Sequence, residues 1–351
     1  MRITMGSKKQ INVGQVKIGG GAPISVQTMT NTNTEDIKST IEQIRKAEGL
    51  GCDIIRVSCP TKEASLALKE IIKQSKIPVI ADIHFNYKRA LEAIESGAHC
   101  VRINPGNIGE AGMKEIVKSA RDHNIPIRIG VNSGSVEKDI LNKFGEPNVD
   151  ALVESAVLNS KKLEDLDFFN FKVSVKSSNV LTMISAYRKL SKKIDYPLHL
   201  GVTEAGTLFP GTIKSSIGIG SLLADGIGDT IRASISGSIE DEVKIGRQIL
   251  KSLGLLNNSV NIISCPTCSR TLINVIEISN ELEKICEDLR KNLNISVLGC
   301  VVNGPGEARE AEIGVFGFKP KVATVCVRGS EIGIFDESEV IRIVRNLINE
   351  F

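Results

Sequence analysis

The sequence predicts a TIM barrel followed by a smaller α+β domain, and three observations support this prediction. Eight short apolar segments recur over residues 23–235, and stretches of helical periodicity lie between them. The segments are apolar almost throughout, which is typical of parallel strands that are covered on both faces. The pattern stops near residue 254, where a CxxC turn begins a different arrangement. We therefore expect a (β/α)8 barrel over residues 1–253 and an α+β domain over residues 254–351.

The strands of the barrel are expected at residues 23–29, 52–58, 78–84, 99–104, 126–132, 171–176, 197–203 and 229–235. The first linking helix shows the pattern, because Ile37, Ile41 and Ile44 form an apolar stripe and Thr34 is placed to cap it. An open doubly wound sheet is the alternative fold with the same alternation of strands and helices. Residues 9–21 predict a small hairpin that closes the floor of the barrel.

Composition excludes several classes of protein. The chain has 351 residues with a net charge of +3, which is too small to indicate nucleic-acid or membrane binding. We expect no secretory signal, because no apolar stretch follows the basic residues near the start of the sequence. We expect no membrane span, because no apolar run approaches the roughly 20 residues required. The eight cysteines then indicate thiols or metal ligands in a reducing cytoplasm.

The second domain is expected to contain a strand from residue 260, a helix over 271–291, a strand over 295–300, a turn over 301–308, strands over 311–318, 321–329 and 331–337, and a helix over 337–351. Cys265 and Cys268 form a CxxC turn, and Cys300 follows a later strand. Three thiolates suit a 4Fe–4S cluster whose fourth ligand would be Glu307, beyond the NGPG turn. By spacing alone, a structural zinc site or a coincidence of three thiols remains open.

Several apolar strands contain a cation in or near their C-terminal halves, namely Arg56, Arg102, Arg128, Lys176 and Arg232. In a TIM barrel these positions face the catalytic end, and the glycine- and hydroxyl-rich loops 203–207 and 234–238 suit a phosphate group. The other interpretation is an internal salt-bridge network that only stabilises the barrel. Polar side chains follow the strands at matching points: Asp82, His84, Asn104, Asn132, Thr203 and Glu204. The long segment 132–148 either covers this site or is a surface insertion.

Eight segments of the chain resemble, in order, the bacterial 4-hydroxy-3-methylbut-2-enyl diphosphate synthase family. They are residues 25–32, 81–86, 101–107, 128–135, 171–176, 199–206, 264–270 and 299–308. The pair CPTC and GCVVNGPGEA is the most specific part of this resemblance, and we see no departure from the family pattern at these positions.

The resemblance implies a two-domain Fe–S oxidoreductase of isoprenoid biosynthesis by the methylerythritol phosphate pathway. Its substrate would be 2-C-methyl-D-erythritol 2,4-cyclodiphosphate, and its electron donor flavodoxin or ferredoxin. By similarity, the cluster ligands would be Cys265, Cys268, Cys300 and Glu307. The diphosphate and neighbouring oxygens would be held by Arg56, Arg102, Arg128, Lys176, Arg232 and Ser234. The site would be lined by Asp82, His84, Asn104, Asn132, Thr203, Glu204 and Asn303, with Glu204 delivering a proton.

The chain length between the two domains predicts a head-to-tail homodimer. A helix over residues 239–253 should run about 22 Å down to the barrel floor, and residues 254–259 extend over about 20 Å at most. The cluster should therefore cap the barrel mouth of a partner chain, which the resemblance also implies. The alternative function is a phosphate-binding TIM-barrel lyase or transferase with a structural zinc domain.

Overall fold

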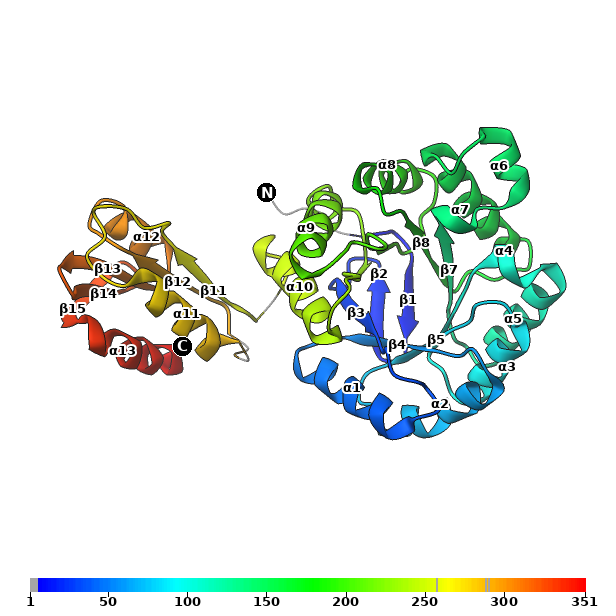
Figure 1. Cartoon of the computed structure of the whole chain (residues 1–351), viewed down its shortest axis with the longest axis horizontal. Helices are drawn as coiled ribbons and strands as arrows, with labels where there is room; N and C mark the ends of the chain where they lie inside the picture. Colours follow the sequence, from blue (N-terminus) through cyan, green and yellow to red (C-terminus); the bar gives the residue numbers. More distant parts are fainter. Residues whose placement is uncertain (1–5, 257, 288, 290) are drawn as a thin grey trace. The chain divides into compact units, whose positions relative to one another are not determined.

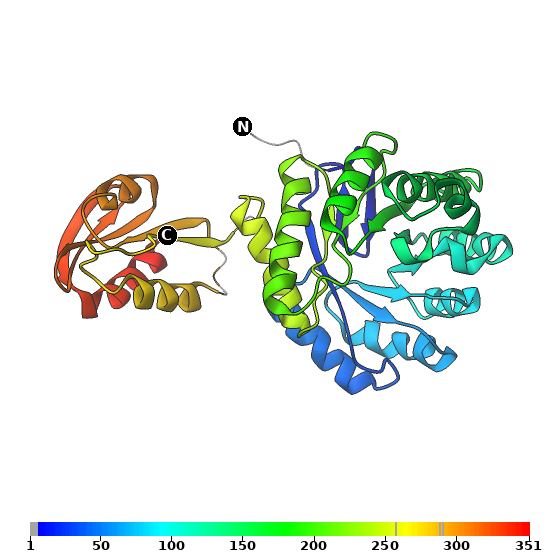
Figure 2. The same ribbon diagram turned by 45° about the horizontal axis from the view of Figure 1, so that its top comes forward.

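The computed structural model describes residues 6–256, 258–287, 289 and 291–351, which form two compact units that divide between Leu255 and Leu256 (Figures 1 and 2). The boundary expected from the sequence lies two residues earlier. No helix among the described residues is long and apolar enough to cross a membrane.

The first unit is built on an eight-stranded parallel sheet with the strand order β8-β7-β6-β5-β4-β3-β10-β9. Its strands are β3 (Ser25–Met29), β4 (Ile54–Ser58), β5 (Val79–Asp82), β6 (Cys100–Ile103), β7 (Ile127–Asn132), β8 (Phe171–Lys176), β9 (His199–Leu200) and β10 (Thr230–Ile231). A parallel bridge between Val173 and Leu198 joins the two ends of this sheet. The predicted barrel is therefore confirmed, and the open-sheet alternative is wrong.

The last two strands are shorter than the sequence predicts. Each pairs over two residues, after which the chain enters the loops 203–207 and 234–238. These loops bond to each other, because Ala205 N donates to Ser234 O at 3.2 Å and Ser236 N donates to Gly206 O at 2.8 Å. Backbone N–H and C=O groups beyond the two short strands thus find hydrogen-bond partners in the neighbouring loop.

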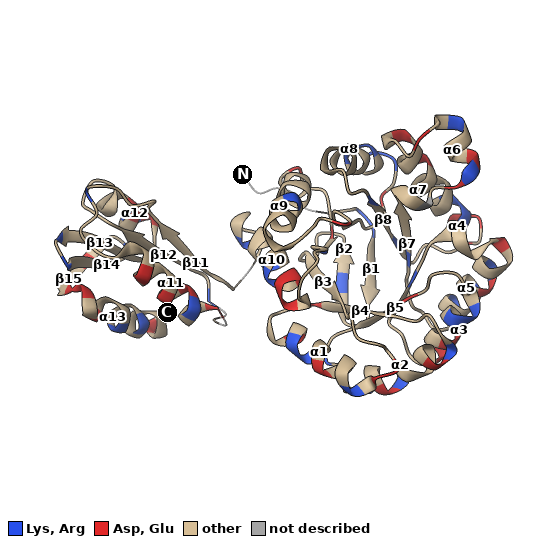
Figure 3. Ribbon diagram, viewed as in Figure 1, with Lys and Arg blue, Asp and Glu red and all other residues tan. Residues whose placement is uncertain are grey.

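Helices surround the sheet, as Figure 1 shows. They are α1 (Ile37–Gly49), α2 (Lys62–Gln74), α3 (Tyr87–Glu95), α4 (Pro105–Ile108), α5 (Glu110–Asp122), α6 (Lys138–Phe144), α7 (Val149–Glu164), α8 (Val180–Leu190), α9 (Leu208–Ala224) and α10 (Ile239–Ser252). The cap predicted for α1 is wrong: Asp36 accepts from Ser39 N at 3.1 Å, whereas the Thr34 hydroxyl donates to Ser58 O. Figure 3 shows charged residues along the outer helices and basic residues on β7 and β8.

The floor of the barrel is closed by the antiparallel hairpin β1 (Gln10–Val13) and β2 (Val16–Gly19). Its apolar side chains pack against the beginnings of three barrel strands in one buried cluster of Ile11, Val13, Ile18, Ile54, Ile80 and Cys100. The predicted hairpin and its position are therefore confirmed. Because the floor is closed, the C-terminal ends of the strands form the open end of the barrel.

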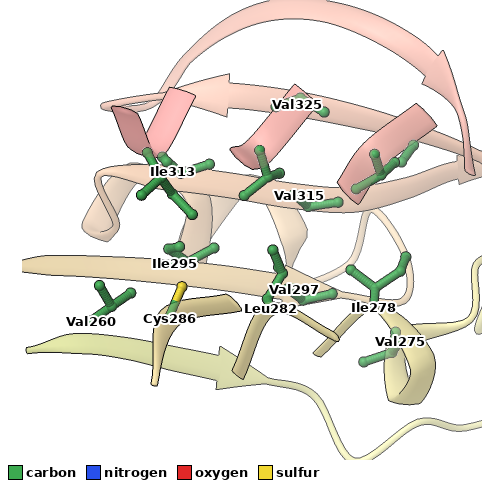
Figure 4. Packing of buried hydrophobic residues seen from close by; sticks show 14 of the residues in the cluster. Val260, Val275, Ile278, Leu282, Cys286, Ile295, Val297, Ile313, Val315 and Val325 are labelled. Atoms are coloured by element: carbon green, nitrogen blue, oxygen red, sulfur yellow. The ribbon is translucent and has the colours of Figure 1, made fainter. Parts of the chain in front are cut away.

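The second unit is a five-stranded mixed sheet in the order β11-β12-β13-β14-β15. Its elements are β11 (Val260–Ser264), α11 (Val275–Cys286), β12 (Leu293–Leu298), α12 (Gly304–Glu310), β13 (Ile313–Lys319), β14 (Val322–Val327), β15 (Ser330–Asp336) and α13 (Glu337–Glu350). Figure 4 shows the apolar core between the sheet and the helices, where Leu282 packs near Val297.

Two expectations for this unit need correction. Helix α11 begins four residues later than predicted, because residues 271–273 run beside the sheet, where Leu272 N donates to Gly299 O at 2.8 Å. Its predicted end includes residues 288 and 290, which lie outside the described residues. The predicted turn over 301–308 contains helix α12, in which Pro305 occupies the first turn, where a missing N–H has no cost.

Candidate functional site

Five buried or half-buried cations of the barrel lie close enough together that their charges influence one another. Their positions follow from the strand register, since each lies on or directly after a parallel strand and side chains alternate across each strand. They are Arg56 on β4, Arg102 on β6, Arg128 on β7, Lys176 on β8 and Arg232 directly after β10. The sequence places all five in or near the C-terminal halves of their strands, and this is wrong for Arg128, which is the second residue of β7 (Ile127–Asn132).

Asp82 lies between two of these cations. Its carboxylate oxygens accept from Arg102 Nη1 at 3.1 Å and lie 3.5 Å from Arg56 Nε, and His84 Nε2 is 3.7 Å away. Burial raises the pKa of the Asp82 carboxyl, but Arg56 and Arg102 outweigh burial and hold that pKa at about 2. Asp82 is therefore an anionic anchor that orients two guanidinium groups.

A thioether separates the guanidinium groups of Arg56 and Arg232. Met29 Sδ lies 3.0 Å from Arg56 Nη2 and 3.9 Å from Arg232 Nη1. Burial lowers the pKa of Arg56 to about 10, an effect that Asp82 opposes and that the charge of Arg232 increases. The two guanidinium groups thus approach the same sulfur atom, and an anion bound by both would relieve their repulsion.

Arg128 and Lys176 have no carboxylate partner among the described residues. Arg128 Nη2 donates to Ser174 Oγ at 2.7 Å, but its Nε and Nη1 atoms are buried without a hydrogen-bond partner. Burial, and then the neighbouring cations, lowers the pKa of both side chains. Buried cations without partners are costly, so these two indicate a ligand of opposite charge. The salt-bridge network exists around Asp82 but leaves this excess charge unbalanced.

Two glycines make room for cations at the open end. A Cβ atom on Gly130 would lie 2.8 Å from Arg102 Nε, and one on Gly201 would lie 2.9 Å from Lys176 Nζ. A Cβ at either position would displace the neighbouring cationic side chain. The glycines therefore allow the arginine and the lysine to lie flat against neighbouring strands.

The polar residues predicted for the site occupy different environments. Asn104 is buried and caps α4 by accepting from Gly106 N at 3.3 Å, while Asn132 ends β7. Thr203 and Ser234 lie half-buried in the paired loops. Glu204 is exposed and adopts a left-handed backbone with φ of 53°. Such strained non-glycine residues are enriched at functional sites.

Two further buried charged residues of the barrel unit were not predicted from the sequence: Glu242 near the open end, and Lys172, which is the second residue of β8 and lies near Cys100 of the floor cluster. Glu242 on α10 is buried and bonds to Arg232, and Lys172 on β8 is fully buried, with a Nζ atom that has no hydrogen-bond partner. Both positions carry a sequence signal. Glu242 interrupts the apolar face of its helix, and Lys172 precedes Lys176 by four residues on the same face of its strand.

The second unit brings the predicted cluster ligands to one edge of its sheet. Cys265 directly follows β11 and Cys300 follows β12, and these strands are parallel neighbours that pair Ser264 with Val297. Gly299 N donates to Cys265 Sγ at 3.2 Å. Glu307 lies in the first turn of α12, which starts four residues after Cys300. Asn303 caps the same helix without a side-chain bond, and so belongs to this unit rather than to the barrel.

Exposure separates the eight cysteines into two groups. Cys268 is exposed and Cys265 and Cys300 are half-buried, whereas Cys52, Cys59, Cys100, Cys286 and Cys326 are buried. All eight lie in the described residues, and none of them forms a disulfide. In the described part of the chain, no three Cys, His, Asp or Glu side chains already converge as a metal site. The accessible thiols on adjacent strand ends, with one N–H directed at sulfur, nevertheless fit the donor chemistry of an iron–sulfur cluster.

Comparison with known protein families gives a match to the family model described as "GcpE TIM-barrel domain" over residues 8–247. The model described as "GcpE protein C-terminal domain" matches residues 261–350. Together the two models span nearly the whole chain.

Similar proteins carry the name 4-hydroxy-3-methylbut-2-en-1-yl diphosphate synthase (flavodoxin). The protein from Clostridium acetobutylicum is 55% identical over 345 residues, which cover 97% of this chain and 96% of that protein. The protein from Symbiobacterium thermophilum is 50% identical over 343 residues, which cover 97% and 92% of the two chains.

Among solved structures, a dihydropteroate synthase from Stenotrophomonas maltophilia aligns with a TM-score of 0.51 at 11% identity, covering 68% of this chain and 97% of that one. A type I 3-dehydroquinate dehydratase from Clostridium difficile aligns with a TM-score of 0.52 at 14% identity, covering 70% and 98%. At these identities the likeness shows the barrel fold alone.

Proposed function

This chain belongs to the GcpE family, and we propose from this premise that its barrel supplies the binding groups, and its second unit the cluster ligands, of an iron–sulfur active site for a cyclic diphosphate. The enzyme converts 2-C-methyl-D-erythritol 2,4-cyclodiphosphate to (E)-4-hydroxy-3-methylbut-2-enyl diphosphate. The names of its relatives contain the name of this product. The reaction consumes two electrons and two protons, opens the diphosphate ring at carbon and releases one hydroxyl as water. The resemblance noted in the sequence thus extends to the whole chain.

The excess of buried positive charge at the open end of the barrel is the observation that supports substrate binding there. Arg56, Arg102, Arg128, Lys176 and Arg232 would bind the diphosphate, together with the hydroxyl of Ser234. Only Asp82 and Glu242 pair with these five cations in the described residues. A cyclic diphosphate would offset most of the remaining charge, and guanidinium groups bind phosphate oxygens in pairs.

The remaining polar residues would orient the substrate and move protons. His84, Asn104, Asn132 and Thr203 would bind hydroxyls, while Asp82 fixes the two arginines beside it. Glu204 would deliver the proton to the departing hydroxyl, and its exposure and strained backbone support a role in contact with a ligand.

Cys265, Cys268 and Cys300 would hold a 4Fe–4S cluster, with Glu307 as the fourth ligand and Asn303 beside it. When bound, the cluster supplies the electrons one at a time. The accessibility of these three thiols, against the burial of the other five, supports this ligand set. The name of the relatives supports flavodoxin as the electron donor. The lack of disulfides among the eight described cysteines supports a reducing cytoplasm as the location.

We also propose a head-to-tail homodimer in which the cluster of one chain serves the barrel of its partner. The short connection between α10 and β11 supports this arrangement. Exposed apolar side chains on α8 and α9 support self-association, since Leu181 is 74% and Phe209 is 77% exposed, with Ile213 and Ile217 on the next turns of α9.

The test is anaerobic turnover of the cyclodiphosphate with reduced flavodoxin, combined with iron, sulfide and zinc analysis. We expect product formation by protein with about four irons and four sulfides per chain. Stoichiometric zinc without sulfide, and no turnover, would instead indicate the lyase or transferase with a structural zinc domain.

A further inference from the structure

Glu242 is a buried carboxylate on an outer helix, and it lies between that helix and strand β3. It is 5% exposed and lies on the same face of α10 as Ile239, Val243 and Gly246. The helix can approach the sheet closely because Gly246 lacks a side chain: a Cβ there would lie 3.0 Å from Val26 on β3. This approach brings Glu242 within reach of the last strand of the barrel.

Each oxygen of Glu242 accepts two donors. Oε2 accepts from Thr28 Oγ1 at 2.6 Å and from Arg232 Nε at 3.2 Å. Oε1 accepts from Arg232 Nη2 at 3.3 Å and from Ile235 N at 3.3 Å. The carboxylate thus bonds to β3, to Arg232 and to the loop after β10. A buried carboxylate with four donors is satisfied and holds each donor in place.

These bonds leave one edge of the Arg232 guanidinium group for a ligand. Nε and Nη2 are engaged by Glu242, whereas Nη1 has only a long contact of 3.9 Å to Met29 Sδ. The bond to Ile235 N also fixes the residue that follows Ser234. Glu242 therefore orders both groups that would bind substrate oxygens after the eighth strand.

We propose that Glu242 is a positioning residue that pre-orients Arg232 and the Ser234 loop for an anionic substrate, an inference that rests on the function proposed above. An arginine that is already held loses less side-chain freedom when the ligand binds, so the affinity is higher. The carboxylate also offsets the repulsion between Arg232 and Arg56 before the substrate arrives.

A double-mutant cycle on the full chain tests this inference. Glu242→Gln, Arg232→Met and the double variant are compared with the wild type by calorimetric binding of the cyclodiphosphate and by steady-state kinetics. We expect Glu242→Gln to raise Kd and KM about tenfold while kcat stays within about twofold. In the Arg232→Met background the same change should have no further effect. Thr28→Val, which removes a donor to Glu242 away from Arg232, should leave Kd within about twofold.

Other outcomes would overturn the inference. Equal losses from Glu242→Gln with and without Arg232 would mean that Glu242 does not act through Arg232. A lower melting temperature with unchanged Kd would mean that Glu242 only stabilises the fold. If Glu242→Gln does not fold, Glu242→Asp keeps the charge but shortens its reach, and the same cycle applies. If the wild type does not bind the cyclodiphosphate, the proposed function fails, and the cycle repeated with inorganic pyrophosphate still decides the role of Glu242.

Discussion

The ammonium nitrogen of Lys176 lies 2.9 Å from the position that a Cβ atom on Gly201 would occupy. The same Cβ would lie 2.6 Å from the carbonyl oxygen of Arg232, so the two strand ends approach each other too closely for any side chain. The absence of a side chain at position 201 therefore determines where two of the predicted diphosphate ligands lie.

Gly201→Ala should displace Lys176 or the backbone at Arg232 and weaken substrate binding. Overpacking of a tight site costs about 1–3 kcal/mol, and we expect the loss in the Kd for the cyclodiphosphate, measured by calorimetry. The matched control is Gly220→Ala on α9, where an added Cβ meets nothing within 4 Å. That variant should bind normally and be more stable by about 0.5–1 kcal/mol. Wild-type affinity in Gly201→Ala would contradict the steric argument.

Lys172 predicts a pH dependence of stability. Burial lowers its pKa from 10.5 to about 8 in the folded chain. Between pH 8 and about 10.5 the unfolded chain therefore binds more protons, and this group makes the folded state more stable as pH rises. Relative to Lys172→Met, the wild-type apoprotein should gain about 3 kcal/mol of unfolding free energy across this window.

Denaturant unfolding of both proteins at several pH values measures this difference. The control is Lys189→Met, because Lys189 is half-exposed and pairs with Asp150 on the surface. Its stability relative to the wild type should change by less than about 0.5 kcal/mol over the same range. If the difference in unfolding free energy between the wild type and Lys172→Met does not change with pH, the buried lysine has gained a compensating partner.

Cys268→Ser should lose the brown colour and the activity together, because it removes one thiolate of the proposed cluster. Cys326→Ala is the matched control, since Cys326 is buried in β14 of the same unit and should keep both iron and turnover. Absorbance, iron and sulfide content of anaerobic protein provide the measurement. Full iron content in Cys268→Ser would remove this residue from the ligand set.

Glu307→Ala should keep the unit folded but change the spectrum of the reduced cluster and abolish turnover. A carboxylate is a harder ligand than a thiolate, so its iron is the one most open to exchange. Electron paramagnetic resonance of the reduced protein, with circular dichroism to check the fold, tests this expectation. An unchanged signal with a near-normal rate would exclude Glu307 as a ligand.

The sequence predicts the barrel well because its strands and its cations follow simple rules. Burial on both faces makes the strands apolar, and a cation at the end of one, such as Lys176, then indicates the catalytic end, whereas Arg128 and Lys172 are second residues of their strands. Glu242 was missed because a carboxylate on an outer helix normally faces solvent. Its burial depends on the close approach of α10 to β3 at Gly246, which only the folded structure reveals.

Local signals with two interpretations account for the other errors. The sequence around Pro305 and Gly306 is typical of a turn, yet a proline is equally suited to the first turn of a helix, and α12 forms there. Thr34 and Asp36 are both good caps, and the bond of Thr34 to Ser58 O leaves Asp36 to cap α1. Distances between elements, rather than residue types, decide such cases.

Complementation between two inactive chains tests whether each active site is built from two subunits. Cys300→Ser should impair only the cluster unit and Arg128→Ala only the barrel. If the cluster serves the partner's barrel, a mixed dimer has one site with both defects and one site with neither. With random mixing, half of the dimers are mixed, so activity should return to about a quarter of the wild-type value. Mixing Cys300→Ser with Cys268→Ser is the control, because both defects lie in the cluster unit and no complete site can form. Mixed dimers that form but remain inactive would show that each cluster serves its own barrel, and would contradict the argument from the short connection after α10.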